Sequence, residues 1–440
     1  MQQAAELPNA AVIHDRPVRR WLSEDWVAVA AGTALVVLVL AGVRPGVPAL
    51  AWGSGADFTT RVLAIGNLAR AIQIGLLLLA ISGAAAVALG IGSRLPKFIA
   101  GFPAIYVLAW LSQVLAGNAT MTTWGLEYVI FALAIGLLVG HTTSFRASFA
   151  EAVQAEFYIK IGLIVMGAGI LFSELVQIGV VGIVQAIVVV LSVWFFSFWL
   201  AKRLNVDDEL ATMMASAVSI CGVSAAIAAC GAIQGDRKKL SYVTSLVLIV
   251  AVPMLIVMPW IAKATAMTPA VAGAWLGGTL DTSAAVVAAG EIVSPQARNA
   301  AVVVKLSQNV LIGVAAFLLT VWWTMRNKTS RQDLNVGVGL IWERFPKFVL
   351  GFLLASLVFS FILPSALVAD TRGVFNALRT NLFALAFVCI GLETSLGDLV
   401  GTGQGRPIAA FLGGQAFNVV VTLVMAYLLF SGLLLPAPQL

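Results

Sequence analysis

Two ionisable residues in this sequence, Asp281 and Lys305, lie within long apolar stretches. Asp281 follows a pair of glycines in "AWLGGTLDTSAAVVAAG", and Lys305 comes ten residues after Pro295 in "SPQARNAAVVVKL". Because Ser294–Pro295 is typical of a helix start and a helix rises about 1.5 Å per residue, Lys305 should lie about 15 Å deep, near the middle of a bilayer. Ionisable residues at that depth indicate a functional site. We expect Asp281 to be the ion-coupling residue and the charge partner of Lys305. A purely structural Asp281–Lys305 pair is the alternative.

A third unusual stretch is "SICGVSAAIA" at 219–228, which has no side chain larger than isoleucine. Gly222 costs about 1 kcal/mol relative to alanine inside a helix, and Ser219 and Ser224 could satisfy backbone groups that a break sets free. The stretch therefore predicts a broken helix near Gly222. Close packing of an unbroken helix remains open.

The two glycine-containing stretches together predict an anion site. Thr282 would cap a second half-helix beginning at Ser283, although an exposed loop around Asp281 is the alternative. A half-helix start exposes unpaired N–H groups and about half a positive charge, which suits a small anion. The predicted substrate-binding residues are Ser219, Cys221, Gly222, Ser224, Thr282, Ser283, Lys305 and Asn309.

The composition indicates a membrane protein. Of 440 residues, 60% are hydrophobic and only 10% are charged, with a mean hydropathy of +0.99, so apolar side chains fill whole windows. The net charge of +6 is scattered between apolar segments and does not suggest nucleic acid. Three cysteines and two histidines argue against a disulfide framework, a metal site or a His-dependent enzyme. We expect no cofactor beyond a coupling Na⁺ or H⁺. No ATP-binding GxxxxGK[ST] motif is present.

The chain should be an all-α polytopic membrane protein with 11–13 apolar segments, two of them broken or re-entrant. Residues 1–25 would form a cytoplasmic segment and 26–440 a single transmembrane domain. A signal-peptidase site at "ALA" (49–51) is the alternative to a retained first helix. The expected segments are 26–43, 66–92, 98–115, 126–141, 157–172, 176–200, 210–234, 241–262, 271–290, 296–325, 347–365, 378–396 and 406–432.

The positions of Lys and Arg leave the path of two segments open. Arg16, Arg19 and Arg20 place the N-terminus in the cytoplasm. A full crossing at 210–234 would put the basic "GDRKK" outside, whereas re-entry would keep it inside. A second re-entry at 271–290 would then restore the order of crossings.

Similar segments indicate internal repeats, as in many secondary transporters. "SAAIAACGAI" (224–233) matches "SAAVVAAGEI" (283–292). "RLPKFIAGF" (94–102) recurs as "RFPKFVLGF" (344–352), and "MGAGILFSEL" resembles "IGLETSLGDL". The spacings of the three pairs differ.

Over residues 95 to 435 the chain resembles the YeiH-type sulfate exporter family, through "SICGVSAAIA", "LDTSAAVVAAG", "VVVKL" and "FPKFVLGF … CIGLETSL". The resemblance implies a multi-pass carrier of the bacterial inner membrane, distantly related to Na⁺/H⁺ antiporters and bile-acid symporters, with broken helices. Two positions depart from the family pattern: Leu280 stands where His is usual and Gln308 where Arg is usual. Both changes weaken the prediction of a doubly charged anion.

We therefore expect a secondary transporter of a small sulfate-like, sulfonate or carboxylate anion, embedded in lipid, with a homodimer left open. A Na⁺/H⁺ antiporter of the same fold class is the alternative. An intramembrane enzyme or receptor subunit is the other class, but no nucleophile–base pair is evident. Glu156 and Lys160, an i,i+4 pair, are expected to be structural.

Overall fold

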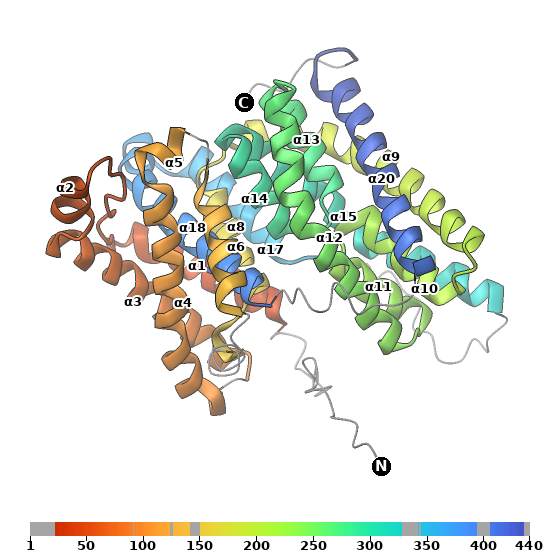
Figure 1. Ribbon diagram of the computed structural model, residues 1–440, viewed down its shortest axis with the longest axis horizontal. Coiled ribbons are helices and arrows are strands. Elements are labelled where there is room, and N and C mark those ends of the chain that lie inside the picture. Colours follow the sequence, from red (N-terminus) through yellow and green to blue (C-terminus); the bar gives the residue numbers. More distant parts are fainter. Residues whose placement is uncertain are drawn as a thin grey trace.

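The computed structural model describes residues 23–90, 92–123, 126–140, 150–327, 342, 345–393 and 405–434. In these ranges the chain is helical, and its only β pairing is an isolated bridge between Trp52 and Asn118. Seven of the described helices are long and apolar enough to cross a membrane. The chain is thus an all-α, multi-pass membrane protein (Figure 1).

Each of the expected apolar segments contains helix. The longer helices are α1 (Glu24–Leu40), α3 (Ile65–Ala88), α4 (Leu95–Ala116), α6 (Tyr128–Gly140), α8 (Ala155–Gly167), α9 (Phe172–Arg203), α10 (Asp208–Ser216), α11 (Val223–Ile233), α12 (Arg237–Ala264), α13 (Pro269–Thr279), α14 (Ser283–Val293), α15 (Pro295–Asn327), α17 (Phe348–Leu357), α18 (Ser365–Glu393) and α20 (Gly405–Phe430). The short pieces are α2 (Gly55–Asp57), α5 (Ala119–Thr123), the 3₁₀ turns Gly92–Arg94 and Ala150–Ala152, and the π-helical turns Phe58–Val62, Ala217–Cys221 and Val358–Ile362.

Side-chain caps fix the helix starts that matter most. Asp207 accepts a hydrogen bond from Leu210 N at the start of α10, and Thr282 accepts one from Ala285 N at the start of α14. Ser294 caps α15 by accepting from Ala297 N, as its position before a proline predicts.

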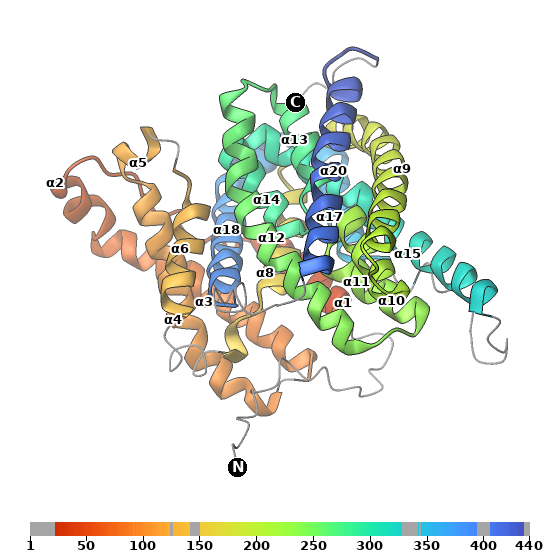
Figure 2. The same cartoon turned by 45° about the vertical axis from the view of Figure 1, so that its right-hand side comes forward.

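Two apolar cores meet along α15. One core gathers residues of α1, α3, α4, α6, α8, α13, α14, α17 and α18, the other gathers residues of α10 and α11, and α9, α12, α15 and α20 contribute to both. Figures 1 and 2 show α3 and α4 at one end of the molecule and α9 and α20 at the other. Because α15 contacts both groups, it is the element that can hold side chains between them.

The segment 210–234 enters the fold and returns on the same side. We call α10, the π turn Ala217–Cys221, Gly222 and α11 hairpin 1. Lys239 follows the hairpin, whereas Asp207 immediately precedes it and Glu209 lies in its first turn. Lys239 Nζ lies 2.6 Å from Asp207 Oδ1 and 3.1 Å from Glu209 Oε2. The two ends therefore meet. Re-entry is the correct reading, and the basic residues after it stay on the side where α9 ends, which we call the near side.

The segment 269–293 forms a second re-entrant pair, hairpin 2, made of α13 and α14. A Cβ at Gly273 of α13 would lie 2.5 Å from Ala297 O, and one at Gly290 of α14 would lie 2.5 Å from Arg298 Cα. Both outer ends thus flank the first turns of α15. The 28 residues of α12, about 42 Å of helix, separate the bases of the two hairpins. Hairpin 2 therefore enters from the opposite, far side.

The strongest internal similarity maps onto matching parts of the two hairpins. "SAAIAACGAI" spans α11 and "SAAVVAAGEI" spans α14, the second leg in each case. Hairpins that enter from opposite sides fit an inverted duplication. The similar segments 166–175 and 390–399 include the last residues of α8 and α18, respectively. Part of the second segment, 394–399, lies outside the described residues. Residues 1–22 of the expected N-terminal segment also lie outside the described residues.

Candidate functional site

The tip of hairpin 1 can form only because residue 222 is a glycine. Gly222 adopts φ 65° and ψ −114°, a conformation that side chains with a Cβ rarely adopt. A Cβ there would lie 2.7 Å from Val247 Cγ1 and 3.1 Å from Asp281 Cβ. The small residue thus permits both the break and direct contact between the tips of the two hairpins.

The tip of hairpin 2 is an extended linker. α13 ends at Thr279, Leu280 is extended with φ −69° and ψ 135°, and the Thr282 hydroxyl accepts from Ala285 N at 3.1 Å to begin α14. The predicted break at Asp281–Ser283 is confirmed. Asp281 lies in the linker, between the carboxyl end of one half-helix and the amino end of the other.

Lys305 joins the two tips. Its Nζ donates to Ile220 O at 2.6 Å, to Leu280 O at 2.7 Å and to Gln308 Oε1 at 3.0 Å. An ammonium group has three donors, so all of its protons are engaged. Gln308 adds a second link through Nε2, which donates to Ser219 O and Gly278 O. Lys305 and Gln308 satisfy carbonyl groups that the breaks release.

Two amides of α20 also bind these tips, and sequence reasoning missed them. Asn418 Nδ2 donates to Val218 O at 3.0 Å and to Thr279 O at 3.2 Å, and Gln415 Nε2 donates to Thr279 O at 3.1 Å. Both side chains are buried. The signal was their spacing with Thr422 at i, i+3 and i+7, which puts three polar side chains on one face of an apolar helix.

Asp281 is buried without a hydrogen bond. It is 2% exposed, and neither carboxylate oxygen has a donor within the described part of the chain. Among those residues no ion pair within 4.0 Å joins it to Lys305. The expected direct contact is therefore replaced by bonds from Lys305 to carbonyl groups, with the two charges acting on each other through space.

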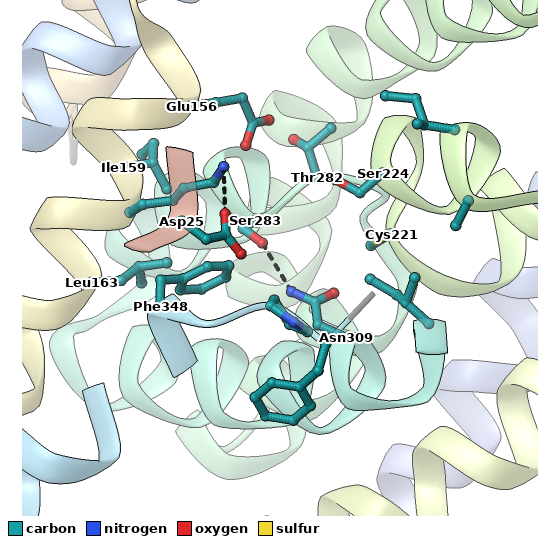
Figure 3. Close-up of a pocket in the computed structure, with 16 residues that line it drawn as sticks. Asp25, Glu156, Ile159, Leu163, Cys221, Ser224, Thr282, Ser283, Asn309 and Phe348 are labelled. Atoms are coloured by element: carbon teal, nitrogen blue, oxygen red, sulfur yellow. Dashed lines mark hydrogen bonds and ion pairs between the residues drawn. The ribbon is translucent and has the colours of Figure 1, made fainter. Parts of the chain in front are cut away.

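A cavity of about 240 Å³ opens beside the tips. Figure 3 shows Cys221 and Ser224 on one wall, Thr282 and Ser283 on another, and Asn309 between them. Asn309 Nδ2 donates to Ser283 Oγ at 3.3 Å. The remaining lining residues are Asp25, Glu156, Ile159, Lys160, Leu163, Ile227, Ala228, Ile312, Phe345, Pro346 and Phe348.

The predicted residues thus fall into two groups within one region. Five line the cavity, and four form the tip contacts behind it. The lining residues are Cys221, Ser224, Thr282, Ser283 and Asn309, and the others are Ser219, Gly222, Asp281 and Lys305.

The near-side wall of the cavity carries charges that sequence reasoning treated as structural. Lys160 Nζ lies 2.7 Å from Glu24 Oε1 and 2.9 Å from Asp25 Oδ1. Asp25, Glu156 and Lys160 all line the cavity. The i,i+4 spacing of Glu156 and Lys160 identified the pair, but nothing in the sequence brought α1 beside α8.

With this geometry in place, the similarity to other proteins is informative. The family described as "Conserved hypothetical protein 698" matches residues 100–410, more than two thirds of the chain. A UPF0324 membrane protein of Rhodopirellula baltica is 38% identical over 349 residues, which are 77% of this chain and 64% of the relative. The chain belongs to this family of UPF0324 membrane proteins. The region that the family matches, 100–410, contains both hairpins and all cavity-lining residues except Asp25.

Other family members extend the comparison. A UPF0324 protein of Nitratidesulfovibrio vulgaris is 38% identical over 352 residues, covering 77% of this chain and 60% of the relative. A UPF0324 protein of Nitrosomonas europaea is 27% identical over 394 residues, covering 78% of this chain and 80% of the relative. The chain spans less than two thirds of the first two relatives. No solved structure matches it, so the kinship with antiporters and the sulfate exporter assignment stay predictions.

Proposed function

We propose that this protein is a secondary active transporter of a small anion in the bacterial inner membrane, with the near side in the cytoplasm. One observation carries the proposal. The amino ends of α11 and α14, which belong to hairpins entering from opposite sides, open onto the same cavity. Such an arrangement of half-helices is typical of substrate sites in secondary transporters.

The chemistry of the cavity floor suits an anion. Each helix start contributes free N–H groups and a positive pole. Ser224 and Ser283 add hydroxyl groups, and Asn309 adds an amide. A volume of 240 Å³ is roughly that of eight waters, which is room for an inorganic sulfur oxyanion, a small sulfonate or a carboxylate with part of its hydration shell.

The closed far side supports transport by alternating access. The Arg298 guanidinium and the Glu291 carboxylate, 2.6 Å apart, are 5% and 14% exposed and join the end of α14 to the start of α15. If the protein opened at this end and closed around Asp25 and Lys160, the site would lose access to the near-side solution and gain access to the far-side solution. The helix tips would move little.

The charges of the near-side wall favour a second candidate, a cation/proton antiporter. Among the charged residues that line the cavity, Asp25 and Glu156 outnumber Lys160, and Asp281 has an unpartnered carboxylate. An antiporter would use these acids and leave the helix starts without a ligand.

A thermal-shift screen followed by flux in proteoliposomes separates the two functions. Sulfate, sulfite, thiosulfate, small sulfonates and carboxylates are tested at constant Na⁺ and pH. We expect one anion to raise Tm and to be transported, and Asn309→Ala to weaken its binding about tenfold.

Ser307→Ala is the matched control, because Ser307 lies on the same helix but donates to Val303 O and faces Gly182. If no anion raises Tm or is transported, while Na⁺ or pH does shift Tm, the protein would be an antiporter instead.

A further inference from the structure

Several buried oxygen atoms around the tip of hairpin 2 have no hydrogen-bond donor in the described residues. They are both carboxylate oxygens of Asp281, the Thr279 hydroxyl oxygen, Gln415 Oε1 and Gln185 Oε1. These four side chains are 0–3% exposed. Buried polar atoms are normally satisfied, so a group of orphaned acceptors indicates a missing positive ligand.

Contacts of their side chains and backbone bring these residues together. Thr279, the last residue of α13, and Asp281 in the linker flank Leu280. Gln415 Nε2 donates to Thr279 O, two residues before Asp281 in the chain, and its amide contributes to the electrostatic environment of the Asp281 carboxyl. On the other flank, a Cβ at Gly278 would lie 2.6 Å from Gln185 Nε2. The tip of hairpin 2 is therefore enclosed by α9 and α20.

The charge that could satisfy these oxygens does not come from Lys305. Its three protons are bonded to Ile220 O, Leu280 O and Gln308 Oε1. The Gln415 amide protons are likewise directed at Thr279 O and Met254 Sδ.

We propose that Asp281, Thr279 and Gln415, with Gln185 at the edge, bind a monovalent cation such as Na⁺. Carboxylate, hydroxyl and amide oxygens are the ligands of hard cations. The carboxyl end of α13 adds a negative pole, and unwound half-helix ends are known Na⁺ ligands in transporters. The described residues hold no group of three His, Cys, Asp or Glu side chains, so one negative charge suits a monovalent ion.

The site and the cavity use opposite ends of the same break. The cation would lie at the carboxyl end of α13, and the anion at the amino end of α14. With Asp281 and Lys305 neutralising each other, a bound cation leaves a net positive charge beside the anion site. This role as a coupling site rests on the proposed function, whereas cation binding does not.

The test is a thermal-shift titration of the purified full-length protein with Na⁺, Li⁺, K⁺ and choline, at constant pH and without added substrate. We expect Tm to rise with Na⁺ but not with choline. Asp281→Asn should abolish the rise, and Thr279→Val should weaken the apparent affinity roughly tenfold. Thr371→Val is the matched control, because the buried Thr371 hydroxyl donates to Leu367 O on α18.

Absence of any cation effect in the wild type, or a Na⁺ response unchanged in both site variants, would overturn the site. A Tm that depends on pH alone and loses this dependence in Asp281→Asn would replace the cation with a proton. Na⁺ binding without anion flux would leave the site standing and refute the anion transporter.

Discussion

At the scale of single residues, Lys305 links the two backbone breaks through hydrogen bonds. Its protons satisfy one carbonyl from each hairpin, while its charge compensates a carboxylate to which it is not bonded. Removing the side chain would leave buried acceptors unpaired and a buried charge uncompensated. The energetic consequences of these two losses can be separated.

We expect Lys305→Met to destabilise the protein by about 3–5 kcal/mol, the usual cost of breaking a buried charge pair. Adding Asp281→Asn should return about 0.5–3 kcal/mol of this loss, because the charge that Lys305 compensated is then absent. Denaturation of the four proteins of the cycle measures the coupling. Lys97→Met, at an exposed position of α4, is the control, and strict additivity would show that the two charges do not act on each other.

Gly222→Ala should destabilise the protein by about 1–3 kcal/mol, because residue 222 has a positive φ and a Cβ would meet Val247 Cγ1 at 2.7 Å. Gly66→Ala is a suitable comparison, since nothing lies within 4 Å of a Cβ at this helical position. It should be neutral or stabilising by about 0.5–1 kcal/mol. Equal Tm values for the two variants would contradict the tight contact between the tips.

At the scale of elements, the two re-entrant hairpins define the topology. Asp207 and Lys239 meet at one base, and Gly273 and Gly290 flank α15 at the other. The chain therefore crosses fewer times than its apolar segments suggest.

Single cysteines introduced in a cysteine-free background test this topology. We expect Arg203→Cys and Lys238→Cys to be labelled from one side of the membrane by an impermeant thiol reagent. Ala266→Cys and Gln296→Cys should be labelled from the other side only. All four positions are exposed at the hairpin bases. Labelling of the first two from opposite sides would mean that 210–234 crosses fully.

Sequence reasoning located both breaks because glycine and capping residues act locally. Gly222 and Thr282 are where the helices end and begin. It could not choose between crossing and re-entry at 210–234, since the distribution of basic residues is a bias. The ion pair of Asp207 with Lys239 settles that choice, and it spans 32 residues of sequence.

The partners of Lys305 were also beyond sequence reasoning. Position along a helix gives the depth of a side chain but not which neighbouring helix it meets. The carbonyls of Ile220 and Leu280 become acceptors only after two distant segments break at the same level. For the same reason Gln415 and Asn418 could be recognised as a polar face, but not assigned to the hairpin tips.

At the scale of the whole molecule, the adjacent cation and anion sites predict mutual reinforcement. Na⁺ should tighten the binding of the transported anion by about five- to 150-fold, the usual range of such couplings. By reciprocity the anion should tighten Na⁺ binding by the same factor. Calorimetric titration of each ion with and without the other measures both factors. Asp281→Asn should reduce both coupling factors to one. An anion affinity that is independent of Na⁺ in the wild type would contradict the coupling.

The cavity that opens beside the hairpin tips also determines where the membrane voltage falls. If water fills the 240 Å³ cavity, the near-side solution reaches the middle of the protein, and most of the potential drops across the packed layer beyond it, around Arg298 and Glu291. One elementary charge moved through that layer corresponds to about 2.3 kcal/mol per 100 mV. Any net charge carried with the site would therefore cross the potential in the short displacement that exposes the site to the far side.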